Sequence, residues 1–345
     1  MNINKLKAAL PKSAPLHVLI SITSDCNLRC IHCYGTYGLV KNELPFSYLK
    51  KILLYLKKQN IIYVNISGGE PTKYSNFENL IDYLDYIELP YCLTTNGLFS
   101  NELFNKINNS KMLLSIKISL DGITPATHLF IRDPKKRNKI IFTKAIDAIK
   151  KFTTENIFVA VGTLVHSNNY NKLLKYPKYL HYLGVKKWVI GPLLKKGRGQ
   201  INELNINSNN IFKLFSNTEF VNELTKLCNL YNIDLDISDF KRIDGKKYVF
   251  ECGAGIHYYH ISTSRIAYPC PLIEYTIFKS DFGVELRTPK DIIKVWQSRQ
   301  FKNWRKQQII GCPNCKLRND CSRCPIQLDI LGKSIYEDID YCLVN

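Results

Sequence analysis

Residues 16–33 read LHVLISITSDCNLRCIHC, and this stretch joins the two signals that decide the fold. Its first eight residues are mostly apolar and β-branched, which is typical of a buried strand. Three cysteines then follow within eight residues, at Cys26, Cys30 and Cys33. Thiols grouped directly after a strand indicate metal binding or catalysis rather than packing.

Length and composition indicate the cellular compartment, and the compartment in turn indicates the role of the cysteines. The chain has 345 residues, 45% of them hydrophobic, which is enough for the core of one or two domains. It has no apolar run as long as a membrane span, and its N-terminal apolar stretch is too short for a signal peptide. We therefore expect a cytoplasmic protein with no membrane partner. Disulfides rarely persist there, so clustered thiols point to metal sites, whereas the isolated Cys92 and Cys228 are expected to be small buried hydrophobes.

The net charge of +19 raises the question of a nucleic-acid partner. Lys outnumbers Arg by 37 to 11, however, and the Lys residues are spread along the whole chain. Specific recognition of phosphates and bases depends strongly on the bidentate Arg side chain. The diffuse Lys excess therefore favours attraction of acidic partners, and nucleic acid is not expected as the main partner.

Strand and helix signals alternate over the first two-thirds of the chain. Helical periodicity at 46–58, 76–87 and 139–152 separates short apolar runs, and a further helix is expected at about 209–231. Such alternation predicts a parallel sheet in a partial (β/α)6 TIM-like barrel, with its chemistry on the loops after the strands. The expected strands lie at 16–23, 61–67, 91–95, 113–120, 157–165 and 185–190.

The alternation stops near residue 240, where cysteines, short strands and turns take over. We therefore expect two domains, a barrel over 1–240 and a small cysteine-rich domain over 241–345.

The residues alone leave the nature of the first cysteine site open. A tetrahedral zinc site would need a fourth ligand, and the nearest candidate is His32, which lies awkwardly beside Cys33. An iron–sulfur cubane held by Cys26, Cys30 and Cys33 would leave one iron open for another ligand. Both interpretations fit the spacing.

The stretch CNLRCIHC resembles the Cys-x3-Cys-x2-Cys signature of the radical S-adenosylmethionine (SAM) superfamily, with His32 at a position that is usually aromatic. SGGEP (67–71) and TTNG (94–97) resemble further elements of that family, as does SLDG (119–122). The resemblance implies a [4Fe–4S] cluster on the three cysteines, with SAM bound to its open iron. The SAM contacts that it implies are Gly68, Gly69 and Glu70 at the amino group, Asn96 in the lining of the site, Ser119 and Asp121 at the ribose, and Arg132 at the carboxylate.

The tail carries a second set of cysteines, in which CPNCKLRNDCSRC (312–324) is the densest run. A four-cysteine zinc knuckle is the simpler alternative, but it leaves three tail cysteines unexplained. The arrangement resembles the SPASM extension, which carries two auxiliary iron–sulfur clusters. It departs from that pattern in having Arg265 where Gly is usual and a gap of two residues, instead of three, before Cys324. The resemblance assigns one cluster to Cys312, Cys315, Cys321 and Cys342, and the other to Cys252, Cys270 and Cys324.

These resemblances imply a radical SAM enzyme that abstracts hydrogen from a peptide. The enzyme then either forms a cross-link, such as a thioether, or epimerises a residue. A small-molecule substrate such as a tetrapyrrole precursor is the alternative, and a non-catalytic redox or zinc nucleic-acid-binding protein is a more remote one. We expect a flavodoxin or ferredoxin as reductant. Only about fifteen residues precede the first strand, so a leader-binding module is expected on a separate protein if not on the barrel or tail. The Lys excess favours an acidic leader.

Overall fold

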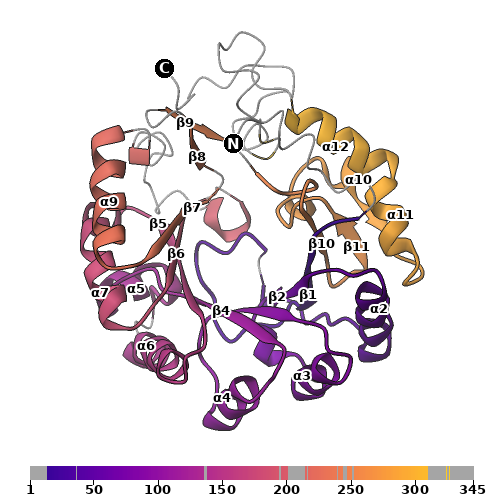
Figure 1. Cartoon of the computed structure of the whole chain (residues 1–345), viewed down its shortest axis with the longest axis horizontal. Coiled ribbons are helices and arrows are strands. Elements are labelled where there is room, and N and C mark those ends of the chain that lie inside the picture. Colours follow the sequence, from indigo (N-terminus) through magenta and orange to yellow (C-terminus); the bar gives the residue numbers. More distant parts are fainter. Residues whose placement is uncertain are drawn as a thin grey trace.

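The computed structural model describes residues 14–309, apart from 36, 136–137, 194–195, 201–213, 216, 239, 244–246 and 251, together with Cys324 and Ile326. A twisted sheet forms the inner layer of the molecule (Figure 1). Its strands lie in the order β12-β11-β10-β1-β2-β3-β4-β5-β6-β7. From β1 to β7, each strand pairs in parallel with the next. These strands are β1 (His17–Thr23), β2 (Tyr63–Gly68), β3 (Tyr91–Thr95), β4 (Leu113–Ser119), β5 (Val159–Val165), β6 (Lys187–Pro192) and β7 (Asp234–Ile237).

Helices between the strands form an outer layer around this ring (Figure 1). In the first of them, Leu49, Ile52, Leu53 and Leu56 recur at helical spacing and are fully buried against the sheet. The helices are α2 (Phe46–Lys58), α3 (Phe77–Tyr86), α4 (Asn101–Asn108), α5 (Pro125–Arg132), α6 (Lys139–Thr154), α7 (Tyr176–Tyr182) and α9 (Thr218–Leu230).

The main core lies between the sheet and these helices. Every second residue of a strand faces the helices, as Ile116 and Ile118 of β4 do, and both are completely buried. The residues between them face the inside of the barrel. The outer face of the barrel wall is therefore apolar, and its inner face can carry polar side chains.

The remaining segments continue the same sheet. Strand β10 (Tyr258–Ile261) pairs in parallel with β1, from His17 opposite Tyr258 to Ile20 opposite Ile261. Strands β11 (Ile266–Tyr268) and β12 (Val284–Glu285) follow in antiparallel pairing. Helices α10 (Lys279–Phe282), α11 (Asp291–Gln297) and α12 (Arg299–Ile309) cover this end, while β8 (Phe240–Ile243) and β9 (Lys247–Phe250) form a separate hairpin.

The predicted partial barrel is confirmed, and four further strands, β7, β10, β11 and β12, extend its sheet. All six expected strands are present within two residues of their predicted starts, and α9 matches the described part of the helix expected at 209–231, of which 209–213 lie outside the described residues. Strand β7 was not foreseen, because DLDI is short and half acidic and so gives no apolar run. Strand β10 was not foreseen as a neighbour of β1, because no local pattern reveals a pairing over more than 200 residues. No helix among the described residues is long and apolar enough to cross a membrane.

Candidate functional site

The candidate site lies where the parallel strands end at their C-terminal edge. The loop after β1, which carries the first cysteines, lies inside the ring of strands (Figure 1). Hydrogen bonds join this loop to the segments after β2, β3 and β6 and to the end of α5. Loops that are distant in sequence thus meet at one edge, as they do in barrel enzymes.

The three predicted thiols lie in one apolar group. Cys30 is 7% exposed and packs with Leu28 and Leu129, while Cys26 and Cys33 pack at the edge of the same group. Burial raises the pKa of the Cys26 thiol to about 12 and that of Cys30 to about 11. Thiolates gathered here therefore require a positive counter-charge, which a metal cluster provides.

This geometry bears on the choice between zinc and an iron–sulfur cluster. Among the described residues, no three Cys, His, Asp or Glu side chains are arranged to hold a single metal ion. His32 is buried, and its Nδ1 has no hydrogen-bond partner. The choice therefore rests on the donor types: three thiols on one loop, with no fourth ligand among the described residues, suit a polynuclear cluster with one open position better than a tetrahedral zinc ion.

Arg198 holds the cysteine loop in place, and it was not singled out from the sequence. Its Nε donates to the Cys30 carbonyl at 2.8 Å, its Nη1 to the Tyr37 carbonyl at 3.0 Å, and its backbone N–H to the Cys33 carbonyl at 2.9 Å. The preceding Gly197 has φ +56°, and a Cβ there would lie 2.2 Å from the Tyr34 carbonyl oxygen. The only sequence signal was a glycine-flanked arginine, GRG, after the sixth strand.

The two glycines of SGGEP bring the end of β2 against the start of the cysteine loop. A Cβ on Gly68, whose φ is +141°, would lie 2.3 Å from the Thr23 carbonyl oxygen, and one on Gly69 would lie 2.2 Å from that of Asp25. The N–H groups of Gly69 and Glu70 donate to these two carbonyls, each at 2.8 Å. The glycines therefore permit close approach within the chain itself, and their predicted contact with SAM stays a prediction.

Glu70 links the segments after β2 and β3. It is 1% exposed, and its Oε1 accepts hydrogen bonds from the hydroxyls of Thr95 at 2.7 Å and Thr72 at 2.8 Å. Its Oε2 accepts from the Asn96 N–H at 2.8 Å. Burial raises the pKa of Glu70, and these hydrogen bonds oppose that shift. The Asn96 side chain donates in turn to Asn27 at 2.7 Å, next to Cys26.

Asp121 and Arg132 form a buried ion pair, with Oδ2 and Nε 2.6 Å apart. Asp121 is fully buried, and its Oδ1 accepts from the Leu164 N–H at 2.8 Å. Burial alone would raise the pKa of Asp121, but the Arg132 guanidinium, His32, His128 and the Leu164 N–H together outweigh burial and hold that pKa well below its usual range. The positive charge of Arg132 also lowers the pKa of Cys30, and the Ile31 N–H donates to the Ile131 carbonyl at 2.9 Å, so the cysteine loop contacts the end of α5. Ser119 lies at the end of β4 and is partly buried.

The tail cysteines that the structure describes also come together. Cys252, Cys270 and Cys324 pack in one small hydrophobic group with Ala254 and Trp304. These are the three cysteines that the sequence assigned to one auxiliary cluster, although their role as ligands stays a prediction. Cys312, Cys315, Cys321 and Cys342, which were assigned to the other cluster, lie outside the described residues.

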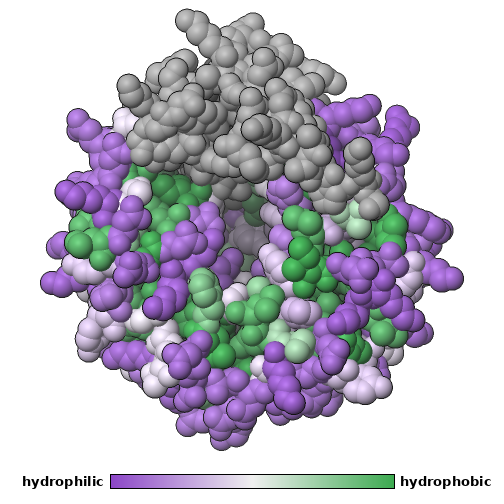
Figure 2. Space-filling view, in the orientation of Figure 1, coloured by the Kyte–Doolittle hydropathy of each residue, from purple (hydrophilic) through white to green (hydrophobic). Residues whose placement is uncertain are grey.

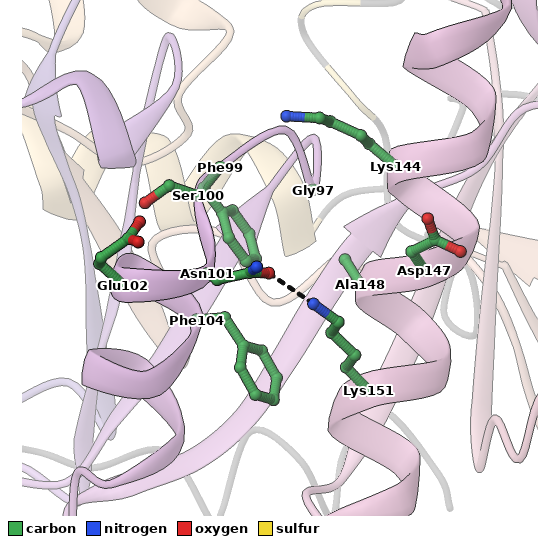
Figure 3. A pocket seen from close by; sticks show the side chains of 10 residues that line it. All are labelled: Gly97, Phe99, Ser100, Asn101, Glu102, Phe104, Lys144, Asp147, Ala148 and Lys151. Carbon is green, nitrogen blue, oxygen red and sulfur yellow. Dashed lines mark hydrogen bonds between the residues drawn. The ribbon is translucent and has the colours of Figure 1, made fainter.

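A separate pocket of about 390 Å³ lies between α4 and α6, outside the ring of strands. Figure 3 shows Lys144 and Lys151 reaching toward it from α6, while Glu102 and Asp147 point away. Lys151 donates to the Asn101 side chain at 2.6 Å. None of the predicted site residues lines this pocket, so it is not the candidate active site.

Comparison with known proteins shows which family part of the chain resembles. Residues 20–176 match the family model described as the Radical SAM superfamily. The mycofactocin maturase MftC of Mycolicibacterium smegmatis is 32% identical over 155 residues, which cover 43% of this chain and 38% of MftC. The PqqA peptide cyclase of Bradyrhizobium diazoefficiens is 24% identical over 314 residues, covering 88% of this chain and 79% of the cyclase. The chain therefore spans well under half of the length of the first of these relatives.

The fold is shared with a solved structure. SuiB of Streptococcus suis, in a crystal structure bound to its precursor peptide SuiA, superposes with a TM-score of 0.75 at 17% identity, over 99% of this chain and 78% of SuiB. The chain thus contains a radical SAM domain, as its cysteine signature predicted. The family implies a [4Fe–4S] cluster and SAM as cofactors.

Proposed function

We propose that this protein is a radical SAM enzyme that modifies a peptide. The observation that carries the proposal is the grouping of Cys26, Cys30 and Cys33 beside Arg132 at the C-terminal edge of the barrel. MftC is named a maturase, the PqqA cyclase acts on a peptide, and SuiB was crystallised with a precursor peptide. These likenesses favour a peptide over a small molecule such as a tetrapyrrole precursor.

The thiols of Cys26, Cys30 and Cys33 would hold the [4Fe–4S] cluster. A bound, reduced cluster would supply the electron for cleavage of SAM to methionine and a 5′-deoxyadenosyl radical, the species that would abstract hydrogen from the substrate. The chain shields this chemistry with Leu28, Leu129 and Ile141, which are at most 7% exposed and surround the thiols. Exclusion of water from such a site suppresses side reactions.

Positioning of SAM falls to the loops around the thiols. Arg132 presents a guanidinium beside the cysteines and is suited to the SAM carboxylate. Asp121 has protein partners on both carboxylate oxygens, so we assign it to fixing Arg132 and not to the ribose contact that the sequence suggested. Ser119 remains the candidate for the ribose, with Gly68, Gly69, Glu70 and Asn96 shaping the side that faces the SAM amino group.

The tail would supply auxiliary redox centres. The packing of Cys252, Cys270 and Cys324 in one group supports an iron–sulfur cluster there. To form a cross-link, a peptide gives up one hydrogen atom to the 5′-deoxyadenosyl radical and then one proton and one electron, and an auxiliary cluster held there would accept that electron. A flavodoxin or ferredoxin would supply the first electron, and a separate protein could hold the leader.

The test is SAM cleavage by anaerobically reconstituted, reduced protein. Wild type should release 5′-deoxyadenosine, and the triple Cys26/Cys30/Cys33→Ala variant should release none while the tail clusters remain visible in the spectrum. Cys228→Ala, which removes a buried thiol from the main core, is the control and should retain cleavage. Cleavage by the triple variant would refute the assignment.

The peptide part of the proposal is tested separately, by mass spectrometry of short peptides encoded beside the gene. A loss of two hydrogens would support a cross-link, and deuterium uptake from heavy water without a mass change in ordinary water would support epimerisation. Turnover of a small molecule with every peptide untouched would favour the alternative substrate.

A further inference from the structure

The inside of the barrel carries polar and charged side chains where a closed barrel has packed branched ones. On β4, Lys117 lies between Ile116 and Ile118, which face the helices, so Lys117 faces inward. Its register partner on β3 is Thr94, whose hydroxyl donates to the Asn65 side chain on β2 at 3.3 Å. Figure 2 shows a hollow at the centre of this face of the molecule. The interior is therefore a place for a polar ligand rather than a second core.

The charges inside the barrel are not balanced evenly. Lys187 on β6 contacts both inward carboxylates of β7, Asp234 at 3.4 Å and Asp236 at 3.1 Å. Lys117 has no hydrogen-bond or ion-pair partner among the described residues, although Asp236 acts on it at longer range. Cys92 nearby does not offset the charge, because burial raises the pKa of its thiol and keeps it neutral. Among the described residues, the Lys117 ammonium is thus left without a hydrogen-bond or ion-pair partner.

The Lys117 stem lies against the neighbouring strand β5 at Gly162. Gly162 on β5 has no side chain, and a Cβ built there would lie 3.7 Å from Lys117 Cδ. Burial lowers the pKa of Lys117, because the charged ammonium is poorly solvated inside the barrel. An anionic group placed here would relieve that cost, whereas a neutral group would not.

We propose that Lys117 binds a carboxylate of the substrate inside the barrel. The inference rests on the proposed peptide-modifying function and assigns the residue that selects an acidic substrate. Lys117 lies two residues before Ser119 on the same face of β4. A carboxylate held there places the adjoining peptide backbone beside the expected SAM contacts. The carboxylate comes from an Asp or Glu side chain or from the C-terminus of the peptide.

The test measures binding without turnover, so it stands apart from the test of SAM cleavage. SAM-loaded, oxidised holoenzyme is titrated by calorimetry with three pentapeptide probes: acetyl-Gly-Gly-Glu-Gly-Gly-amide, its Gln counterpart, and acetyl-pentaglycine with a free C-terminus. An ionic hydrogen bond contributes about 1.5–3 kcal/mol, so we expect an acidic probe to bind about tenfold or more tightly than the Gln probe.

Variants assign the effect to this residue. Lys117→Met should abolish the preference for the acidic probe, and Lys117→Arg should retain most of it. Lys186→Met removes the same charge from the exposed neighbour of β6 and should change nothing. The unfolding temperature and cluster absorption of Lys117→Met establish that the variant is folded.

Each outcome decides the proposal. Preference for the Glu probe assigns an internal acidic side chain, and preference for the free C-terminus assigns the chain end. Equal binding of all three probes to wild type, or an unchanged preference in folded Lys117→Met, would overturn the proposal.

Discussion

Arg265 has a backbone conformation that is unusual for a residue other than glycine. It occupies a position where the SPASM extension usually has Gly. Its φ is +61°, in the left-handed region that favours Gly. Its guanidinium lies over the Tyr48 ring, 5.3 Å from the centroid, and its carbonyl accepts from the Leu286 N–H at 2.8 Å. These contacts offset the unfavourable backbone conformation of a non-glycine residue. The departure from the family pattern thus keeps the backbone turn and changes only the residue that makes it.

Gly69 is the residue at which a single added methyl group should disturb the site. Gly69→Ala places a Cβ 2.2 Å from the Asp25 carbonyl oxygen, so the SGGEP segment must move away from the cysteine loop. We expect a loss of about 1–3 kcal/mol in the free energy of unfolding, together with reduced iron retention after reconstitution. Urea unfolding and iron analysis measure the two effects.

The control for this change is Gly191→Ala on β6. The nearest atom to a Cβ there is Ser238 Oγ at 3.5 Å, an ordinary contact, so this variant should resemble wild type. Iron content in Gly69→Ala equal to that of Gly191→Ala would contradict the role given to the close approach.

At the scale of elements, the decisive feature is the seam between β1 and β10. The sequence predicts a boundary near residue 240, yet the sheet runs across it, because β10 lies in parallel beside β1. The Leu16 N–H extends the seam by donating to the His257 carbonyl at 2.7 Å. Without the tail segment, β1 would become an open strand edge, and such edges promote aggregation.

We therefore expect residues 1–240, expressed alone, to aggregate or to unfold without cooperativity. The matched control is the full chain cut at a protease site introduced after residue 244, which keeps both segments present. Light scattering after size-exclusion chromatography should show a monomer-sized cleaved complex and larger species for the fragment. A monodisperse fragment with a cooperative thermal transition would show that the barrel is an independent domain.

At the scale of the whole molecule, buried neutral histidines should make the fold sensitive to acid. His260 on β10 is fully buried at the seam, where its Nε2 lies 2.8 Å from the Ser21 hydroxyl, and burial lowers its pKa to about 3. Burial likewise lowers the pKa of His128 to about 3 and that of His32 to about 4. In the unfolded chain these groups titrate near their ordinary pKa of about 6.5. Between those values the unfolded state binds more protons, so stability falls as the pH falls below about 6.5.

His260→Asn tests this linkage. A pKa change of this size contributes about 2 kcal/mol of lost stability between pH 7.5 and pH 5. The variant should therefore lose about 2 kcal/mol less than wild type over this interval, measured by urea unfolding at both pH values. His181→Asn alters an exposed histidine and should lose as much as wild type. The same loss in His260→Asn as in wild type would show that His260 does not contribute.

The sequence by itself determined the alternation of strands and helices and placed three cysteines on the loop after the first strand. Six strands and the first cysteine site follow from local signals, namely apolar runs of β-branched residues and thiols spaced over one loop. These signals are local because each depends on residues within about ten positions. The match of residues 20–176 to the radical SAM family agrees with them.

Only the tertiary structure decided which distant groups meet. It paired β10 with β1, set Arg198 on the carbonyls of the cysteine loop, and directed both oxygens of Asp121 to protein partners. It also left Lys117 without a partner inside the barrel, among the described residues. Such contacts cannot be predicted from a local sequence pattern. The free energy of a hydrogen bond, an ion pair or a buried charge depends on the groups that the folded chain brings within a few ångströms.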